Sequence, residues 1–164
     1  MKLKVPYHKQ ETTYTCAIAT LRMILDFLGI KNHRNKLVKG LKPDKEEGVP
    51  HGRIIEFIRE VGLYSYVNNE SDIDEIKYYL KEGNPVIVNY LDLVDNEGHY
   101  SIIVGFEEHK FILNDPWNGE GFEIGFKDFE KRWRSGFEHG LRWLMVVSKE
   151  PFHLGRQYKP DNSM

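Results

Sequence analysis

The hydrophobic positions divide the chain into a first half with helical spacing and a second half with short, strand-like runs. Apolar residues fill most positions from 16 to 28 and leave only a narrow polar stripe, and Gly29 follows. Dense apolar spacing that ends at a glycine predicts a mostly buried, central helix over 16–28. Three further helices are predicted in this half, over residues 33–39, 52–61 and 72–81.

The second half contains apolar or alternating runs bounded by Gly, Pro, Asn or Asp, which is typical of strands. Strands are predicted at 85–91, 99–106, 111–114, 122–126 and 141–148, with a short helix over 128–133. Helices followed by strands favour an α+β fold, in which an N-terminal helical layer packs on a C-terminal, largely antiparallel sheet. We expect residues 1–150 to form this domain, and the polar tail 151–164 to be loose or to dock late.

Composition narrows the class of protein. The length of 164 residues suits one domain, and 40% hydrophobic residues with 13% aromatics indicate a folded core. The net charge is −2, with no long basic run, so nucleic acid is not expected as a partner. No apolar stretch approaches the roughly 20 residues of a membrane helix, and no secretory signal follows Met1. These features predict a cytoplasmic protein without a membrane span.

A single cysteine, Cys16, excludes an intrachain disulfide framework and a zinc site built from several cysteines. Apart from His99, the histidines form no pair at metal-ligand spacing with a carboxylate helper. They are His8, His33, His51, His109, His139 and His153. We therefore expect neither a metal nor another cofactor.

Cys16 is the first candidate for chemistry. A cysteine on an apolar helix is, taken alone, consistent with a small buried side chain. Thr13 or Thr15 can cap the helix, however, and either cap places Cys16 in the first turn. The positive end of the helix dipole favours a thiolate there, so we expect a depressed pKa in the range of about 3.5 to 7.5.

Three polar residues could act with this thiol. His99 opens a strand and can serve as its proton partner, although a surface histidine would look the same. Asp115 ends the next predicted strand before a proline, where an ordinary turn is the alternative. Gln10 lies six residues before Cys16, within reach of an oxyanion near the Cys16 N–H, and is otherwise a solvated loop residue.

Strand register decides whether His99 and Asp115 can meet. A three-residue hairpin loop at 107–109 would place them diagonally on one face of the sheet. A loop of two or four residues would send them to opposite faces. We therefore predict the first register, or a bulge that restores it, with Asp115 bonded to one His99 nitrogen and the other nitrogen facing Cys16.

In this order, the four residues resemble a known family, the papain-like cysteine peptidase domains that cleave double-glycine leaders in bacteriocin-exporting ABC transporters, and their stand-alone relatives. The likeness covers about residues 5–147. Its motifs are Val5-Pro6-Tyr7, Gln10-Glu11-Thr12-Thr13-Tyr14-Thr15-Cys16, Gly98-His99-Tyr100-Ser101-Ile102-Ile103-Val104-Gly105-Phe106 and Asn114-Asp115-Pro116-Trp117. The resemblance implies a papain-like fold, with Cys16 as nucleophile, His99 as base and acid, Asp115 orienting His99, and Gln10 as oxyanion-hole donor.

Three functions follow as hypotheses. The first is a peptidase that cleaves a peptide or isopeptide bond through an acyl-enzyme. The second is an acyl transferase that passes the acyl group to an amine or thiol, and the third is a catalytically silent module that binds a peptide. A Walker-type phosphate loop is absent from the sequence, so we expect the stand-alone form. Each hypothesis implies a peptide or protein partner and leaves the oligomeric state open.

Overall fold

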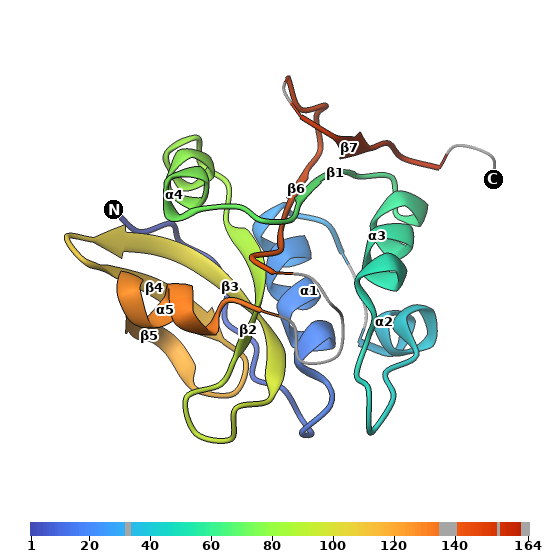
Figure 1. The fold of residues 1–164 in the computed structure, drawn as a ribbon. Coiled ribbons are helices and arrows are strands. Elements are labelled where there is room, and N and C mark those ends of the chain that lie inside the picture. Colours follow the sequence, from blue (N-terminus) through green and yellow to red (C-terminus); the bar gives the residue numbers. More distant parts are fainter. Residues whose placement is uncertain (32–33, 135–140, 154, 162–164) are drawn as a thin grey trace.

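A computed structural model describes residues 1–31, 34–134, 141–153 and 155–161 (Figure 1). In these ranges the helices are α1 (Cys16–Phe27), α2 (Arg34–Leu41), α3 (His51–Glu60), α4 (Ile73–Lys81) and α5 (Phe126–Arg132). The strands are β1 (Tyr64–Asn68), β2 (Val86–Leu91), β3 (Gly98–Glu107), β4 (Lys110–Asp115), β5 (Gly119–Gly125), β6 (Leu144–Ser148) and β7 (Gln157–Tyr158). The predicted helix start at His33 lies outside the described residues.

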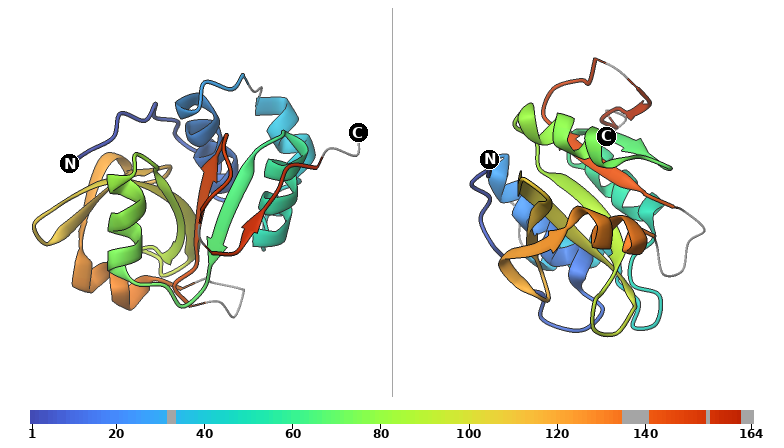
Figure 2. Two further views of the ribbon diagram at one scale, coloured as in Figure 1. Left: turned by 90° about the horizontal axis from the view of Figure 1, so that it is seen from above. Right: turned by 60° about the vertical axis from the view of Figure 1, so that its left-hand side comes forward.

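The strands form a 7-stranded sheet in the order β5-β4-β3-β2-β6-β1-β7, and all of its pairings are antiparallel. Helices α1, α2 and α3 cover one face, and α4 and α5 lie on the other (Figures 1 and 2). The predicted α+β class is confirmed, but the helix at 72–81 lies on the far side from the N-terminal layer. The reason is that β2 is buried on both faces, so each face needs a cover.

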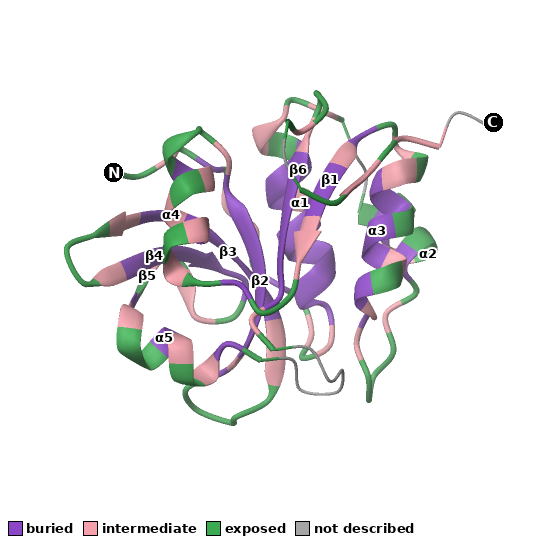
Figure 3. Cartoon of the chain, turned by 45° about the horizontal axis from the view of Figure 1, so that its top comes forward, coloured by how far each residue is buried: buried purple, intermediate pink, exposed green. Residues whose placement is uncertain are grey.

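Helix α1 is the centre of the first core. It buries nine of its twelve residues, including Leu21, Met23 and Ile24, against the sheet and against α2 (Figure 3). The predicted mostly buried helix is therefore confirmed. Its packing fixes the N-terminal end of α1, and hence Cys16, against β3.

Two strands were not predicted. β1 is a five-residue segment between two helices, and β7 contains only two residues. β6, the last long strand, inserts between β2 and β1, so β1 gains a partner from the other end of the chain. Pairing across such a distance leaves no local periodicity that would identify so short a strand.

The tail docks on the body. Gln157 and Tyr158 pair with Tyr66 and Ser65 of β1, and the ring of Phe152 lies 6.1 Å from that of Tyr66. Of the two predicted alternatives, the described tail residues thus adopt the docked one.

The β3–β4 register contains a bulge. Glu107 pairs with Lys110, so the loop has two residues, and the three-residue loop is wrong. The register then shifts between Ile103 and Gly105, and Ile102 faces Asn114. This pairing is the one that a three-residue loop would have given, so the bulge restores the predicted register. The extra residue is Val104, whose carbonyl oxygen accepts the backbone N–H of Leu3 at 2.8 Å.

The docked tail should contribute to stability. We expect Phe152→Ala to lower the free energy of unfolding by about 1–2 kcal/mol, less than the roughly 3–5 kcal/mol of a fully buried Phe, because the ring is only partly buried. Deletion of residues 151–164 should cost more, since it also removes β7. Urea unfolding measures both effects, with Val94→Ala, at an 84% exposed position, as the control. Midpoints unchanged from wild type in both variants would contradict the docked tail.

Candidate active site

Cys16 is the first residue of α1, as the capping residues predicted. Thr15 occupies the N-cap position of α1. Its hydroxyl does not bond to the backbone of the first helical turn and instead donates to the carbonyl oxygen of Thr12 at 3.2 Å. The sulfur accepts the backbone N–H of Tyr100, in β3, at 3.4 Å. The nucleophile candidate is therefore held directly against the strand that contains His99.

The pKa of Cys16 differs from the expectation. Burial raises the pKa of this thiol to about 11, and the N–H of Tyr100 offsets only part of that effect. The predicted depressed pKa is wrong for this structure. The helix dipole acts on a sulfur that has lost most of its water, and desolvation of the thiolate is the larger effect.

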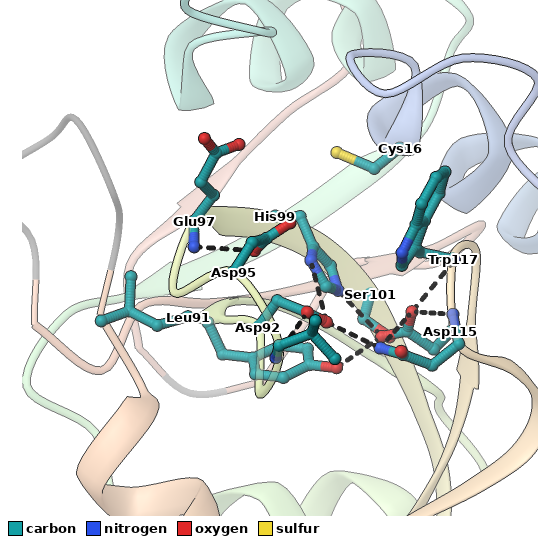
Figure 4. Close-up of polar contacts among 12 residues, drawn as sticks. Cys16, Leu91, Asp92, Asp95, Glu97, His99, Ser101, Asp115 and Trp117 are labelled. Carbon is teal, nitrogen blue, oxygen red and sulfur yellow. Dashed lines mark hydrogen bonds and ion pairs between the residues drawn. The ribbon is translucent and has the colours of Figure 1, made fainter.

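His99 and Asp115 come together as predicted. Nε2 of His99 lies 2.9 Å from Oδ2 of Asp115, which is completely buried (Figure 4). The same carboxylate oxygen accepts the hydroxyl of Tyr90 at 2.6 Å, and Oδ1 accepts the backbone N–H groups of Trp117 and Asn118. Burial by itself would raise the pKa of Asp115, but the hydrogen bond and charge of His99 and these donors lower it to about 2.

A second buried carboxylate, Asp92, was missed. Its Oδ1 lies 3.8 Å from Nδ1 of His99, and the residue is 1% exposed. The side-chain amide of Asn118 donates to Oδ1 of both acids, at 2.8 Å to Asp92 and 3.2 Å to Asp115. The available signal was an acid placed directly after the apolar run of β2, on the hairpin that leads to His99.

The ring of His99 thus faces two carboxylates. Burial acts to lower its pKa, but the hydrogen bond and charge of Asp115, followed by the charge of Asp92, raise it above the ordinary value. Figure 4 shows both contacts, with Cys16 on the other side of the ring. The polar contacts of these described residues include none between His99 and Cys16. The expectation that the second ring nitrogen faces Cys16 stays a prediction; Nδ1, the nitrogen not bonded to Asp115, lies 3.8 Å from Oδ1 of Asp92.

Gln10 lies in the loop that enters α1. Its backbone N–H donates to the carbonyl oxygen of Pro116 at 3.0 Å. The hydroxyl of Tyr7 donates to the backbone carbonyl oxygen of Asp115 at 2.7 Å. These bonds fix the loop to the end of β4. The side chain is buried and donates an N–H to the carbonyl oxygen of Thr12 at 2.7 Å. Gln10 lines a small pocket with Thr15 and Ile18, and it is not among the residues that line the larger pocket beside Cys16.

A cleft of about 570 Å³ opens beside the sulfur. Its lining includes Cys16 at the start of α1, Gly48 and Val49 from the segment before α3, and Asn89 and Tyr100 from strands β2 and β3. Within the described ranges, no group of three His, Cys, Asp or Glu residues is placed to hold a metal ion. Across the same ranges, no helix has the length and apolar character that a membrane span requires.

Solved structures share this fold. A double glycine motif protease from an AMS/PCAT transporter, solved with its leader peptide, is 17% identical, with 89% of this chain and 92% of that one covered and a TM-score of 0.71. A C39-like peptidase from Bacillus anthracis is 16% identical, with 92% and 98% covered and a TM-score of 0.73. The peptidase domain of Streptococcus ComA, a bi-functional ABC transporter, is 19% identical, with 90% and 98% covered and a TM-score of 0.72.

The family comparison covers most of the sequence. No curated protein matches the chain. The model of the Peptidase_C39 like family matches residues 2–136, which include the α1 N-terminus, the cleft and the end of β4. The chain therefore belongs to the Peptidase_C39-like family and is a papain-like cysteine peptidase.

Proposed function

We propose that this protein cleaves a peptide or isopeptide bond through Cys16, His99 and Asp115, with a thioester acyl-enzyme as intermediate. One observation carries the proposal. The fold brings Asp115 to His99 at 2.9 Å, and it brings Cys16 to the backbone of Tyr100, the residue after His99. Three side chains from distant segments are thus gathered around the start of β3, where Cys16 lines an open cleft.

Acylation begins with the buried thiol. Cys16 is neutral in the free protein, so its proton must leave as the sulfur attacks the substrate carbonyl. His99 accepts that proton at Nδ1, since Nε2 is bonded to Asp115. Contacts of this kind are often loose without substrate and tighten in the complex. The tetrahedral intermediate then collapses, His99 returns the proton to the leaving amine, and the acyl group remains on Cys16 as a thioester.

Deacylation uses the same groups. His99 removes a proton from water, the hydroxide attacks the thioester, and the acid leaves as the sulfur regains a proton. In both steps the carbonyl oxygen becomes an oxyanion. We assign two donors to this oxyanion: the backbone N–H of Cys16, at the start of α1, and a side-chain N–H of Gln10.

Asp92 supports the proton transfers through His99. The two carboxylates stabilise the imidazolium that forms when His99 takes the proton, and this makes neutral His99 a stronger base than a free imidazole. Asp92 acts through His99 and is not assigned a contact with the sulfur or the substrate, so it is a positioning residue. Its role is to orient the His99 ring and to stabilise its protonated form.

The substrate is a peptide or protein segment. The cleft is open, and a structure with the same fold was solved in complex with a leader peptide. Cytoplasmic location stays a prediction. The acyl-transfer chemistry shares every step up to the thioester and differs only in the acceptor.

The direct test is incubation with a diverse peptide pool, analysed by mass spectrometry. We expect new termini with wild-type protein and none with Cys16→Ala. If glycine amide is added and the N-terminal fragments of cleaved peptides are found attached to it, the protein transfers the acyl group to an amine instead of hydrolysing the thioester. Saturable binding of peptides without any turnover would support the silent module and refute the peptidase.

The oxyanion role of Gln10 has its own test. Gln10→Ala should lower kcat by about 10² to 10³, the usual loss for one oxyanion donor, while thermal stability changes little. Gln10→Glu keeps the size of the side chain but removes the N–H donors, so it should lose a similar factor. Activity within a few fold of wild type in both variants would leave Gln10 as a loop residue.

The contribution of Asp92 can be measured on His99. Asp92→Asn should lower the pKa of His99, observed by NMR titration of the ring, because a negative charge beside the imidazolium is removed. Asp95→Asn is the matched control, and its exposed carboxylate should give a smaller shift.

The same variant predicts a pH-dependent stability difference. The folded pKa of His99 is raised, so its stabilising effect is present below about pH 6.5, the ordinary unfolded value, and is lost as pH rises through the folded value. Wild type should therefore exceed Asp92→Asn in melting temperature by more at pH 5.5 than at pH 9. An equal difference at both pH values would show that Asp92 acts only through packing.

A further inference from the structure

Asn89 interrupts a strand that is buried at five of its six residues. β2 has the sequence Val-Ile-Val-Asn-Tyr-Leu, and Asn89 is 1% exposed among apolar neighbours. Asparagine is depleted in strands, and a polar residue at a buried strand position breaks the apolar pattern. Such a break in an otherwise consistent element is typical of a functional position.

The amide of Asn89 lacks a hydrogen-bond partner within the described part of the chain. Both Nδ2 and Oδ1 are buried and unsatisfied. Buried amides are nearly always hydrogen-bonded, because an unpaired donor or acceptor loses its water without compensation. A donor and an acceptor that remain unpaired together point to a ligand that supplies both.

The position of Asn89 identifies where that ligand binds. Its side chain lines the 570 Å³ cleft that also contains Cys16. In the sheet it pairs directly with Tyr100, whose backbone N–H contacts the sulfur of Cys16. Asn89 therefore lines the cleft on the strand next to β3, whose backbone contacts the sulfur of Cys16.

We propose that Asn89 is a specificity-determining residue of this cleft, and that it recognises an uncharged hydrogen-bonding side chain of the substrate close to the scissile bond. The proposal rests on the peptidase function above and deepens it. The amide can donate to a side-chain oxygen and accept from a side-chain N–H or O–H. Substrate Asn, Gln, Ser and Thr fit this description.

The distribution of charge in the cleft favours an uncharged group. Lys45, Glu46, Glu47, Glu97 and Arg134 also line the cleft, and all five are exposed. The formal charges are therefore at the solvent-facing rim, where both signs are present. The neutral Asn89 amide is buried, and a charged substrate side chain placed there would lose its water without a counter-ion.

Cleavage profiling tests the proposal. A proteome-derived peptide pool is digested, and the residue types within three positions of each cleaved bond are counted. Wild type should enrich Asn, Gln, Ser or Thr at one position, and Asn89→Leu should replace them there with apolar residues. For a peptide pair that differs only as Gln or Met at this position, wild type should favour Gln by about tenfold in kcat/KM, the size expected for one or two net hydrogen bonds.

Two variants separate recognition from folding. Ser65→Ala removes another buried, unpaired side-chain oxygen, in β1 and outside the cleft lining, and should leave the cleavage profile unchanged. If Asn89→Leu does not fold, Asn89→Ala removes the same amide without added bulk and should abolish the polar preference. Identical profiles for wild type and the Asn89 variants would overturn the proposal.

Binding without cleavage distinguishes this proposal from the peptidase function. In a Cys16→Ala background, peptides captured from the same pool should show the same polar preference, and the second substitution Asn89→Leu should remove it. A preference that appears in capture, although wild type cleaves nothing, would refute the peptidase and support the subsite. Cleavage or capture without a preference that depends on Asn89 would refute the subsite, as would the absence of both.

Discussion

The buried pair of His99 and Asp115 is the interaction on which the site depends. A carboxylate with no exposed surface is costly unless each of its oxygens is paired. Here Oδ2 accepts from His99 and Tyr90, and Oδ1 accepts from the chain that follows. The end of β4, the tight turn after it and the start of β3 are therefore fixed together. The backbone carbonyl of Asp115 extends this arrangement to Tyr7, and thus to the loop that delivers Cys16.

This arrangement keeps the thiol neutral and stabilises the imidazolium that His99 becomes once it has accepted the Cys16 proton. Burial raises the pKa of Cys16, whereas two carboxylates raise the pKa of His99. A thiolate next to these carboxylates would be repelled by them, and Asp115 indeed adds to the raised pKa of Cys16. Proton transfer is therefore coupled to attack on a substrate, when charge can move from sulfur to an oxyanion held by N–H donors.

Local chemistry in the sequence made Cys16, His99 and Asp115 candidates, because each lies at the start or end of a predicted element, and their order and the family resemblance singled them out from the ordinary alternatives. The register of β3 and β4 could be limited to two alternatives by side-chain alternation alone. The choice between them depended on a bulge at Val104, whose carbonyl oxygen pairs with the N-terminal segment. That contact joins residues a hundred positions apart, so no local pattern could predict it. β1 was missed for the same reason, since its partners come from the last third of the chain.

Asp92 and Asn89 show what tertiary structure adds. In sequence, both look like ordinary polar residues at or near the end of an apolar strand. Their significance comes from burial: Asp92 becomes a second carboxylate on His99, and Asn89 becomes an amide without a partner. Thr20 and Ser65 have unpaired buried hydroxyls and Gln10 an unpaired buried amide oxygen, yet none of the three lines the cleft. A lone hydroxyl is a small loss, whereas an amide has both a donor and an acceptor to satisfy. The position of Asn89 beside the nucleophile is what turns this cost into a means of selecting substrates.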